Sequence, residues 1–269
     1  MADTPPRDAI ARLAGCSVVD VQPLSGGDVS SVAAVRLADG RRIVAKSGGP
    51  VRAEAAMLRA IAATGCPAAR VVAVNDTCLL MERLAEGRAS DMGWAQAGHA
   101  VATLHAATGA RYGWETDHAI GPALQPAAPT DDWPAFWAER RLLAWPEALP
   151  GEVARRLDTL AARLPDLLPK APPASLLHGD LWTGNLIFDG AFQGLIDPAS
   201  YYGDAEVDLA ALTTFGTPPA SFWEGYGPLR DGWQDRRPVY RLWIALLHLR
   251  LFGGGYRGMV ETCLNAARA

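Results

Sequence analysis

The chain has 269 residues, of which 49% are hydrophobic and 20% are charged, and its formal net charge is −4. This length suits one large domain or two lobes with a substantial core, and the charge excludes the basic surface that nucleic-acid binding requires. Four widely separated cysteines without a CxxC pair argue against a zinc site or a disulfide framework and favour a reducing cytoplasm. Neither an apolar leader nor a run long enough to span a bilayer is visible, so we expect no membrane partner.

The first third of the chain is predicted to consist of strands around one helix. Apolar alternation and turn signals place five strands at residues 18–24, 29–37, 42–46, 70–74 and 78–81. A helix is expected at 51–62, because Val51, Ala55 and Leu58 fall on one face. We assign residues 1–84 to a small, β-rich lobe that holds the nucleotide-binding sheet.

From about residue 90 the pattern becomes helical. Helices are expected to begin near residues 90, 133 and 153, the last of them ending before Pro165, and two more to carry residues 240–252 and 256–264. We assign residues 85–269 to a larger lobe. A sheet with one helix, followed by a mainly helical part, is the α+β layout of a two-lobed, protein-kinase-like fold, in which a nucleotide binds in the cleft between the lobes.

Residues 178–185, with the sequence HGDLWTGN, are the most informative segment. Asp180 precedes Asn185 by five residues, and Asp197 follows Asn185 by twelve, which is the spacing of a kinase catalytic loop. In such a loop one carboxylate orients the attacking hydroxyl and accepts its proton, while an amide and a second carboxylate hold Mg²⁺. A hairpin predicted at 186–196 would bring Asn185 and Asp197 to the same end of two paired strands. We predict Asp180 as the catalytic base and Asn185 and Asp197 as the Mg²⁺ ligands.

Two further residues are expected to support this loop. His178 is predicted to pack and to hydrogen-bond so that the loop is held in place, rather than to act on the substrate. Asp208 is predicted to cap the helix that follows it and to brace the catalytic loop from behind.

Lys46 ends the third predicted strand and is the only lysine among the first 169 residues. A kinase places at this position the lysine that contacts the α- and β-phosphates of ATP. Glu54, early in the following helix, is its expected ion-pair partner, with Glu82 and Glu86 as alternatives.

Two backbone segments are expected to complete the ATP site. The turn at Gly26 and Gly27 lies between the first two strands, where backbone N–H groups can cradle phosphates. Backbone groups of Glu82 and Leu84, where the small lobe ends, are expected to read the adenine edge. An ordinary turn and an ordinary strand exit are the alternatives at these two places.

Several segments resemble the fructosamine kinase (ketosamine-3-kinase) family, a branch of the kinase-like fold that includes aminoglycoside phosphotransferases. The resemblance runs from about residue 18 to 265 and is carried by residues 112–125, 133–142, 197–210 and 248–256. It implies ATP-dependent phosphorylation of the 3-hydroxyl of a ketosamine, on a free amine adduct or a glycated protein. The family's product is unstable and releases the amine, which repairs glycation. Asp180 matches the family's proton acceptor, Asn185 and Asp197 its metal ligands, and Lys46 its phosphate-contacting lysine.

The residues that would contact the sugar are less constrained by the sequence. Trp182 could stack on an apolar sugar face, or equally pack between the lobes. Tyr202 follows the metal loop and could line the same pocket, or equally pack inside the protein. His118 stands where the family often has Asn, and residues 126–130 are rich in Pro and Ala where the family is polar. These departures leave open which sugar and which amine the protein accepts.

Two other functions remain open at this point. One is a kinase of another small alcohol, such as an aminoglycoside or a choline-like amino alcohol, whose positive charge would be met by acids such as Glu115, Asp204 and Glu206. The other is a nucleotide-binding pseudokinase that acts as a regulator, which is disfavoured because the four expected catalytic, metal-binding and phosphate-binding residues are all present. A monomer is favoured, although no sequence feature fixes the oligomeric state.

Overall fold

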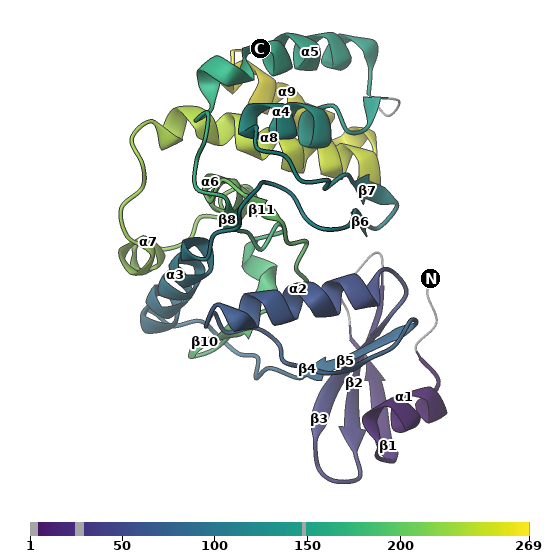
Figure 1. Ribbon diagram of the computed structural model, residues 1–269. Helices are drawn as coiled ribbons and strands as arrows, with labels where there is room; N and C mark the ends of the chain where they lie inside the picture. Colours follow the sequence, from purple (N-terminus) through teal and green to yellow (C-terminus); the bar gives the residue numbers. More distant parts are fainter. Residues whose placement is uncertain (1–4, 25–29, 147–148, 269) are drawn as a thin grey trace.

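The computed structural model describes residues 5–24, 30–146 and 149–268. These residues form a small lobe with a sheet and a larger, mainly helical lobe, as the sequence predicts (Figure 1). The small lobe holds one antiparallel sheet with the strand order β1-β2-β3-β5-β4. Its strands are β1 (Val18–Pro23), β2 (Ser31–Leu37), β3 (Arg42–Ser47), β4 (Val71–Val74) and β5 (Cys78–Glu82).

Two helices cover opposite faces of this sheet. Successive residues of a strand point to opposite faces, and in β5 Leu79 packs with Val51 of α2 (Val51–Ala63), whereas Leu80 packs with Ile10 of α1 (Arg7–Ala14). Helix α2 was expected. Helix α1 was not, so the small lobe contains two helices rather than one. Helix α1 has no polar N-cap residue in the sequence, since Pro6 stands at that position, and Ile10 is its only buried residue.

Among the residues that the structure describes, the larger lobe contains seven helices and three short antiparallel strand pairs. The helices are α3 (Asp91–Ala106), α4 (Trp133–Trp137), α5 (Gly151–Leu167), α6 (Glu206–Leu212), α7 (Ala220–Tyr226), α8 (Trp233–Phe252) and α9 (Arg257–Ala266). A π-helix, η1 (Ala138–Leu142), extends α4, and two 3₁₀ turns lie at Thr183–Asn185 and Gly254–Tyr256. The antiparallel pairs are β6 (His118–Ile120) with β7 (Ala123–Gln125), β8 (Ser175–Leu176) with β11 (Tyr202–Gly203), and β9 (Leu186–Asp189) with β10 (Ala191–Leu195).

Two helix boundaries differ from the sequence expectation. Helix α5 continues past Pro165 to Leu167, because the buried Leu164 still accepts a hydrogen bond of 2.9 Å from the backbone N–H of Leu168. Helix α8 begins at Trp233, seven residues before the expected start at Tyr240, and it includes a proline in its second turn. The pattern identified the buried residues of α5 but not its last turn, and it missed the first turns of α8 with the buried Trp233 and Val239.

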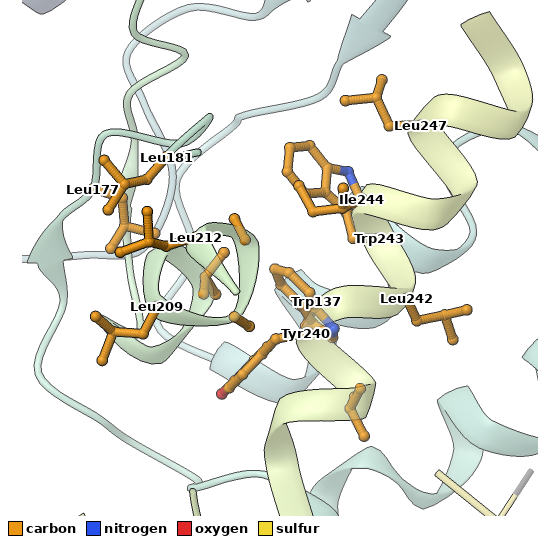
Figure 2. Close-up of a cluster of buried hydrophobic side chains, with 14 of the residues drawn as sticks. Trp137, Leu177, Leu181, Leu209, Leu212, Tyr240, Leu242, Trp243, Ile244 and Leu247 are labelled. Atoms are coloured by element: carbon orange, nitrogen blue, oxygen red, sulfur yellow. The ribbon is translucent and has the colours of Figure 1, made fainter. Parts of the chain in front are cut away.

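The core of the larger lobe holds the catalytic segment in place. Figure 2 shows α8 packed against α6 through a cluster that includes Trp137, Leu209, Tyr240 and Trp243. Leu177 and Leu181, which flank the HGD segment, belong to the same cluster and are fully buried. The side chains on either side of Asp180 are thus fixed in a close-packed interior.

The chain passes from β5 to α3 through residues 83–90, and we infer that the lobe boundary lies here, after Leu84. Among the helices of the described residues, none combines the length and the apolar character needed to cross a membrane.

Candidate active site

A cleft of about 880 Å³ lies between the two lobes. One end is apolar and is lined by Val32, Val44 and Met81 from the small lobe and by Ile187 and Ile196 from the larger lobe. The middle holds the polar residues that the sequence analysis selected, namely Lys46, Glu54, Asp180, Asn185 and Asp197. The fold therefore brings these residues together from the sheet, from α2, from the HGD segment and from the β9–β10 hairpin.

The catalytic loop is held from behind by Asp208 of α6. One carboxylate oxygen of Asp208 accepts a hydrogen bond of 2.6 Å from the backbone N–H of His178, and the other accepts one of 2.9 Å from that of Gly179. Gly179 has φ +82°, and a Cβ at this position would lie 2.0 Å from the carbonyl oxygen of Ala199. The loop can therefore approach the metal-loop backbone only with glycine here. Asp208 braces the loop as expected, but it lies inside the first turn of α6 and makes no capping hydrogen bond to that helix.

His178 is fully buried, and its Nε2 lies 2.8 Å from the carbonyl oxygen of Ile196. This contact ties the catalytic loop to the end of the β9–β10 hairpin. The position agrees with the predicted supporting role.

His105 of α3 was not selected from the sequence. Its Nε2 lies 3.1 Å from Asp208 Oδ2, and its Nδ1 lies 2.9 Å from the hydroxyl of Tyr226. A neutral imidazole that donates to Asp208 and accepts from Tyr226 satisfies all three groups. No sequence pattern identifies this contact, because His105 and Asp208 are 103 positions apart.

Asp180 and Asn185 are joined directly. Asn185 Nδ2 donates to the Asp180 backbone carbonyl at 2.8 Å and to its Oδ2 at 3.3 Å. Burial raises the pKa of Asp180, and the neighbouring Asp197 carboxylate raises it further, against the opposing effects of His178, His248 and Asn185. The carboxylate thus has more affinity for a proton than an exposed aspartate, which suits a group that receives one.

Lys46 lies between two carboxylates. Its Nζ is 2.8 Å from Glu54 Oε2 and 2.7 Å from Asp197 Oδ1. Burial opposes the charge of Lys46, but Glu54 and Asp197 outweigh it, and the pKa of Lys46 is raised. Burial raises the pKa of Glu54, and the nearby Asp197 carboxylate raises it further, against the opposing effect of Lys46. Of the three acids considered as partners of Lys46, the structure selects Glu54.

Asn185 and Asp197 have the donor atoms that Mg²⁺ prefers. The amide nitrogen of Asn185 is used by Asp180, which leaves its Oδ1 as an acceptor. Asp197 has φ +54°, and its side chain remains 43% exposed despite the contact with Lys46. Two hard oxygen donors at the mouth of a cleft suit Mg²⁺, which takes few protein ligands and leans on substrate phosphates.

The predicted adenine and phosphate contacts have mixed outcomes. Leu84 lines the apolar end of the cleft. Glu82 lines it too, but its backbone N–H donates to the carbonyl of Arg70 at 2.9 Å and is not available to a ligand. Gly26 and Gly27 lie outside the described residues.

The sequence model of the fructosamine kinase family matches residues 12–268. The chain belongs to this family. It is 39% identical over 228 residues to "Probable ketoamine kinase slr1563" of Synechocystis, a match that covers 80% of this chain and 77% of that protein. The crystal structure of a "putative fructosamine-3-kinase" from Thermobifida fusca superposes with a TM-score of 0.91 at 30% identity, and covers all of both chains. The amicoumacin kinase hAmiN, solved with AMP-PNP and Ca²⁺, shares the fold alone, with a TM-score of 0.65 and 15% identity over 98% of this chain and 93% of that one.

These relationships confirm the two-lobed, protein-kinase-like fold and show that the protein is a kinase. The ATP use that the family implies agrees with the apolar end of the cleft and with Lys46 beside the catalytic loop.

Of the two residues considered as substrate contacts, Trp182 lines the cleft of this kinase and Tyr202 does not. Trp182 lines the cleft and is 42% exposed, so it is not packed between the lobes. Tyr202 does not line the cleft. Its pairing with Leu176 in the β8–β11 ladder turns its ring onto Trp114, with 5.8 Å between ring centroids, and over Gly109. The prediction that Tyr202 lines the substrate pocket is wrong.

The acids proposed to bind a cationic acceptor are also elsewhere. Asp204 and Glu206 are buried and paired with Arg230, and Glu206 is also paired with Arg236 at 2.7 Å. Glu115 is exposed and does not line the cleft. None of the three can meet an acceptor bound near Asp180.

The end of the cleft beyond Asp180 was largely missed by the sequence analysis. One wall is aromatic: the ring of His248 on α8 lies 4.7 Å from that of Phe215 and 5.0 Å from that of Tyr256. The other wall is the β6–β7 hairpin, with His118 and Ile120. Residues 112–125 and 248–256 carry the family resemblance, but no local pattern shows that they face each other, because the two walls meet only through the packing of the larger lobe.

Proposed function

We propose that this kinase transfers the γ-phosphoryl group of ATP to the 3-hydroxyl of a ketosamine. The observation that carries the proposal is the convergence of Lys46, Asp180, Asn185 and Asp197 in one cleft of a chain that belongs to the fructosamine kinase family. Because the product of such a reaction is expected to release its amine, the activity would remove sugar adducts from amines or proteins.

In the proposed reaction the acceptor hydroxyl lies against Asp180. The hydroxyl oxygen attacks the γ-phosphorus, the bond from that phosphorus to the β–γ bridging oxygen breaks, and ADP leaves. The hydroxyl proton passes to the Asp180 carboxylate, which needs only to position the hydroxyl and accept the proton late if the transition state is loose. The raised pKa of Asp180 is consistent with this role.

The charged and polar groups around Asp180 are placed to bind the triphosphate and its metal ion. Lys46 would contact the α- and β-phosphates while Glu54 holds its ammonium group in place. Asn185 and Asp197 would hold Mg²⁺, which when bound neutralises the charge on the β- and γ-phosphate oxygens. Since Asp197 now contacts Lys46 at 2.7 Å, that ion pair must rearrange or be shared when metal and phosphate bind.

The acceptor end suits a sugar better than a polycation. The half-exposed ring of Trp182 offers an apolar face against which a sugar can stack. The acids among the described residues that line the cleft are Asp180 and Asp197, Glu54, which is paired with Lys46, and Glu82 and Glu86, which lie where the small lobe ends. Asp204 and Glu206 do not line it and are paired with arginines. An aminoglycoside would find no further carboxylates here. A small-molecule acceptor, a cytoplasmic location and a monomeric state complete the proposal.

The test is consumption of Mg-ATP with a panel of acceptors: ribulose-lysine, erythrulose-lysine, fructose-lysine, an aminoglycoside and choline. Turnover with a ketosamine, followed by loss of the adduct, supports the proposal and ranks the sugars. Turnover with the aminoglycoside or choline alone would overturn it, and ATP binding without turnover of any acceptor would favour the pseudokinase. The Asp180→Asn variant is the matched control, because it keeps the size of the side chain and its contact with Asn185.

A further inference from the structure

The β6–β7 hairpin forms one wall of the acceptor end of the cleft. His118 on β6 is paired across the hairpin with Gln125 on β7, so their side chains lie on the same face. His118 is only 6% exposed, yet it lines the cleft together with Ala119 and Ile120. Figure 1 shows the hairpin on the side of the larger lobe that faces α2 of the small lobe. A bound acceptor would therefore have His118 beside it.

Arg141 lies directly behind this wall, on the π-helix η1. Its side chain is fully buried, and the guanidinium carbon lies 4.1 Å from the ring centroid of Tyr201 and 4.8 Å from that of Phe136. One guanidinium nitrogen donates to the backbone carbonyl of Pro126 at 2.9 Å. In the described part of the chain no ion pair of Arg141 is found, so its positive charge is met by aromatic faces and by two backbone carbonyls, those of Pro126 and Arg140. Short π-helical turns of this kind occur frequently at functional sites.

Unpartnered polar atoms gather around Arg141. In the described residues, buried atoms without a hydrogen-bond partner include Nδ1 of His118, Oε1 of Gln125, and Nε and Nη2 of Arg141. Buried polar groups are almost always paired, and each exception points to a missing partner such as a water or a ligand. Other such atoms lie elsewhere, on Glu54 and Trp233 for example, but these four lie on or directly behind one wall of the substrate cleft.

The wall has a definite chemical character. Burial and the nearby charge of Arg141 lower the pKa of His118 to about 4, against the opposing effects of the Asp117 carboxylate and of a hydrogen bond to the backbone of Ala199. One ring nitrogen of His118 is used by the backbone of Ala199, and in a neutral imidazole the unpartnered Nδ1 is then an acceptor, which matches a hydroxyl group that donates. The uncompensated charge of Arg141 behind it repels an ammonium group. This wall therefore suits the neutral, hydroxyl-bearing part of an acceptor and disfavours its cationic part.

We propose that His118 is a specificity-determining residue that binds a hydroxyl of the sugar part of the acceptor, and that Arg141 keeps the acceptor's ammonium group away from this wall. The proposal rests on the proposed ketosamine activity and adds the orientation of the substrate to it. The sugar lies along the β6–β7 hairpin, and the amine with its substituent points away from the hairpin.

Steady-state kinetics of His118 variants test the contact. With ribulose-lysine, His118→Leu is expected to raise the KM of the acceptor at least tenfold, with kcat and the KM of Mg-ATP within twofold of the wild type. His118→Gln keeps a donor and acceptor near the Nε2 position and His118→Asn near the Nδ1 position, so one of them should restore most of the loss. Unchanged acceptor kinetics in His118→Leu, or a loss that neither polar variant restores, would overturn the proposal.

Acceptors that lack one hydroxyl provide the matched control. For the analogue without the hydroxyl that His118 binds, the wild type and His118→Leu should have the same kcat/KM, whereas they should differ for every other analogue. If His118→Leu loses the same factor with all analogues, the residue acts only on the fold and the inference is wrong. If the wild type turns over no ketosamine, the proposed function fails instead, and the same variants are then assayed with the acceptor that the panel identifies.

The role of Arg141 is tested separately with Arg141→Met, which keeps the length and the aromatic contacts but removes the charge. The imidazole signals of His118 in the NMR spectrum, followed from pH 8 to 5, should show a neutral ring throughout in the wild type and a higher pKa in the variant. Should the variant not fold, the titration of the wild type still decides, because a His118 that gains a proton near pH 6.5 would contradict the proposal.

Discussion

Lys46 and Asp197 are 151 positions apart in the chain, and the ammonium nitrogen of Lys46 lies 2.7 Å from a carboxylate oxygen of Asp197. One residue belongs to the sheet of the small lobe, and the other follows the β9–β10 hairpin of the larger lobe. The ion pair therefore joins the lobes across the cleft, and Glu54 completes it from α2. In a kinase, a lysine, a helix glutamate and a metal-binding aspartate must be in place together before phosphoryl transfer.

Replacement of Lys46 is expected to impair the use of ATP. We predict that Lys46→Met lowers kcat/KM for Mg-ATP by roughly 10²-fold, because a charged group aimed at the transferring phosphates is lost. The free energy of unfolding should change little, since the variant also removes the burial cost of the ammonium group while it leaves Glu54 free to bind a proton. ATP titrations and chemical denaturation of the variant measure the two effects. Unaltered ATP kinetics would remove Lys46 from its assigned role.

Replacement of Asp180 separates chemistry from binding. We predict that Asp180→Asn lowers kcat by about 10³-fold, within the range for loss of a general base. The affinity for Mg-ATP should stay within a few-fold, because Asn185 and Asp197 provide the metal contacts. Single-turnover kinetics and ATP titrations provide the check. Substantial turnover by this variant would mean that another group accepts the proton.

The brace behind the catalytic loop should affect both stability and rate. His105→Leu leaves Tyr226 without its partner and removes one hydrogen bond from the buried Asp208. We expect a loss of about 1–3 kcal/mol in the free energy of unfolding, the usual cost of leaving buried polar groups unpaired. His105→Gln retains a donor for Asp208 and should recover part of it. A kcat that falls in the Leu variant while both KM values hold would show that His105 positions the loop, whereas equal stability of all three proteins would contradict the described network.

His118 makes the fold sensitive to acid. Its pKa is lowered from 6.5 to about 4 in the folded protein, so between these values the unfolded chain binds the additional proton. Stability that is present above pH 6.5 is therefore lost as the pH falls toward 4, by roughly 3 kcal/mol at most. In His118→Gln this component should vanish, and the curve of unfolding free energy against pH should become flatter between pH 6.5 and 4. Parallel curves for the two proteins would contradict a neutral, buried His118.

The buried acidic network provides a stability prediction away from the cleft. Asp204 accepts a hydrogen bond of 2.7 Å from the hydroxyl of Tyr240 and pairs with Arg230. Asp204→Ala should cost about 1–3 kcal/mol, because it leaves the buried Tyr240 hydroxyl without its acceptor, whereas the partly exposed Arg230 keeps Glu206 as a partner. Denaturant titration measures this loss. Full stability of Asp204→Ala together with a changed KM for acceptors would contradict this prediction, because it would mean that Asp204 contacts the substrate.

The sequence predicts those features that depend on local spacing. The positions of Asp180, Asn185 and Asp197 follow from the catalytic-loop spacing and from a hairpin whose turn fixes its register, and the five strands and α2 follow from apolar periodicity. Lys46 and Glu54 follow from their places at the end of a strand and in the next helix. These are relations within one or two elements, which short-range patterns can carry.

The features that were missed depend on tertiary packing. Tyr202 follows the metal loop closely in the sequence, but the short β8–β11 ladder directs its ring to Trp114. From the sequence, Asp204 and Glu206 could bind a substrate, but in the folded protein Asp204 is paired with Arg230 and Glu206 with Arg236 of α8. Likewise the unpaired charge of Arg141 behind His118 is apparent only when η1 and the β6–β7 hairpin are seen together. No local sequence pattern predicts which carboxylate pairs with which arginine.

The most direct test of the account is to identify the oxygen that receives phosphate. Wild-type protein with Mg-ATP and ribulose-lysine should give a product whose phosphorus couples, in ¹H–³¹P correlation spectra, to the proton on carbon 3 of the sugar. Lysine should then appear as this product decays, and the Asp180→Asn variant should give neither signal. Phosphate on another oxygen, or ADP formed from ATP at the same rate with and without the acceptor, would contradict the account.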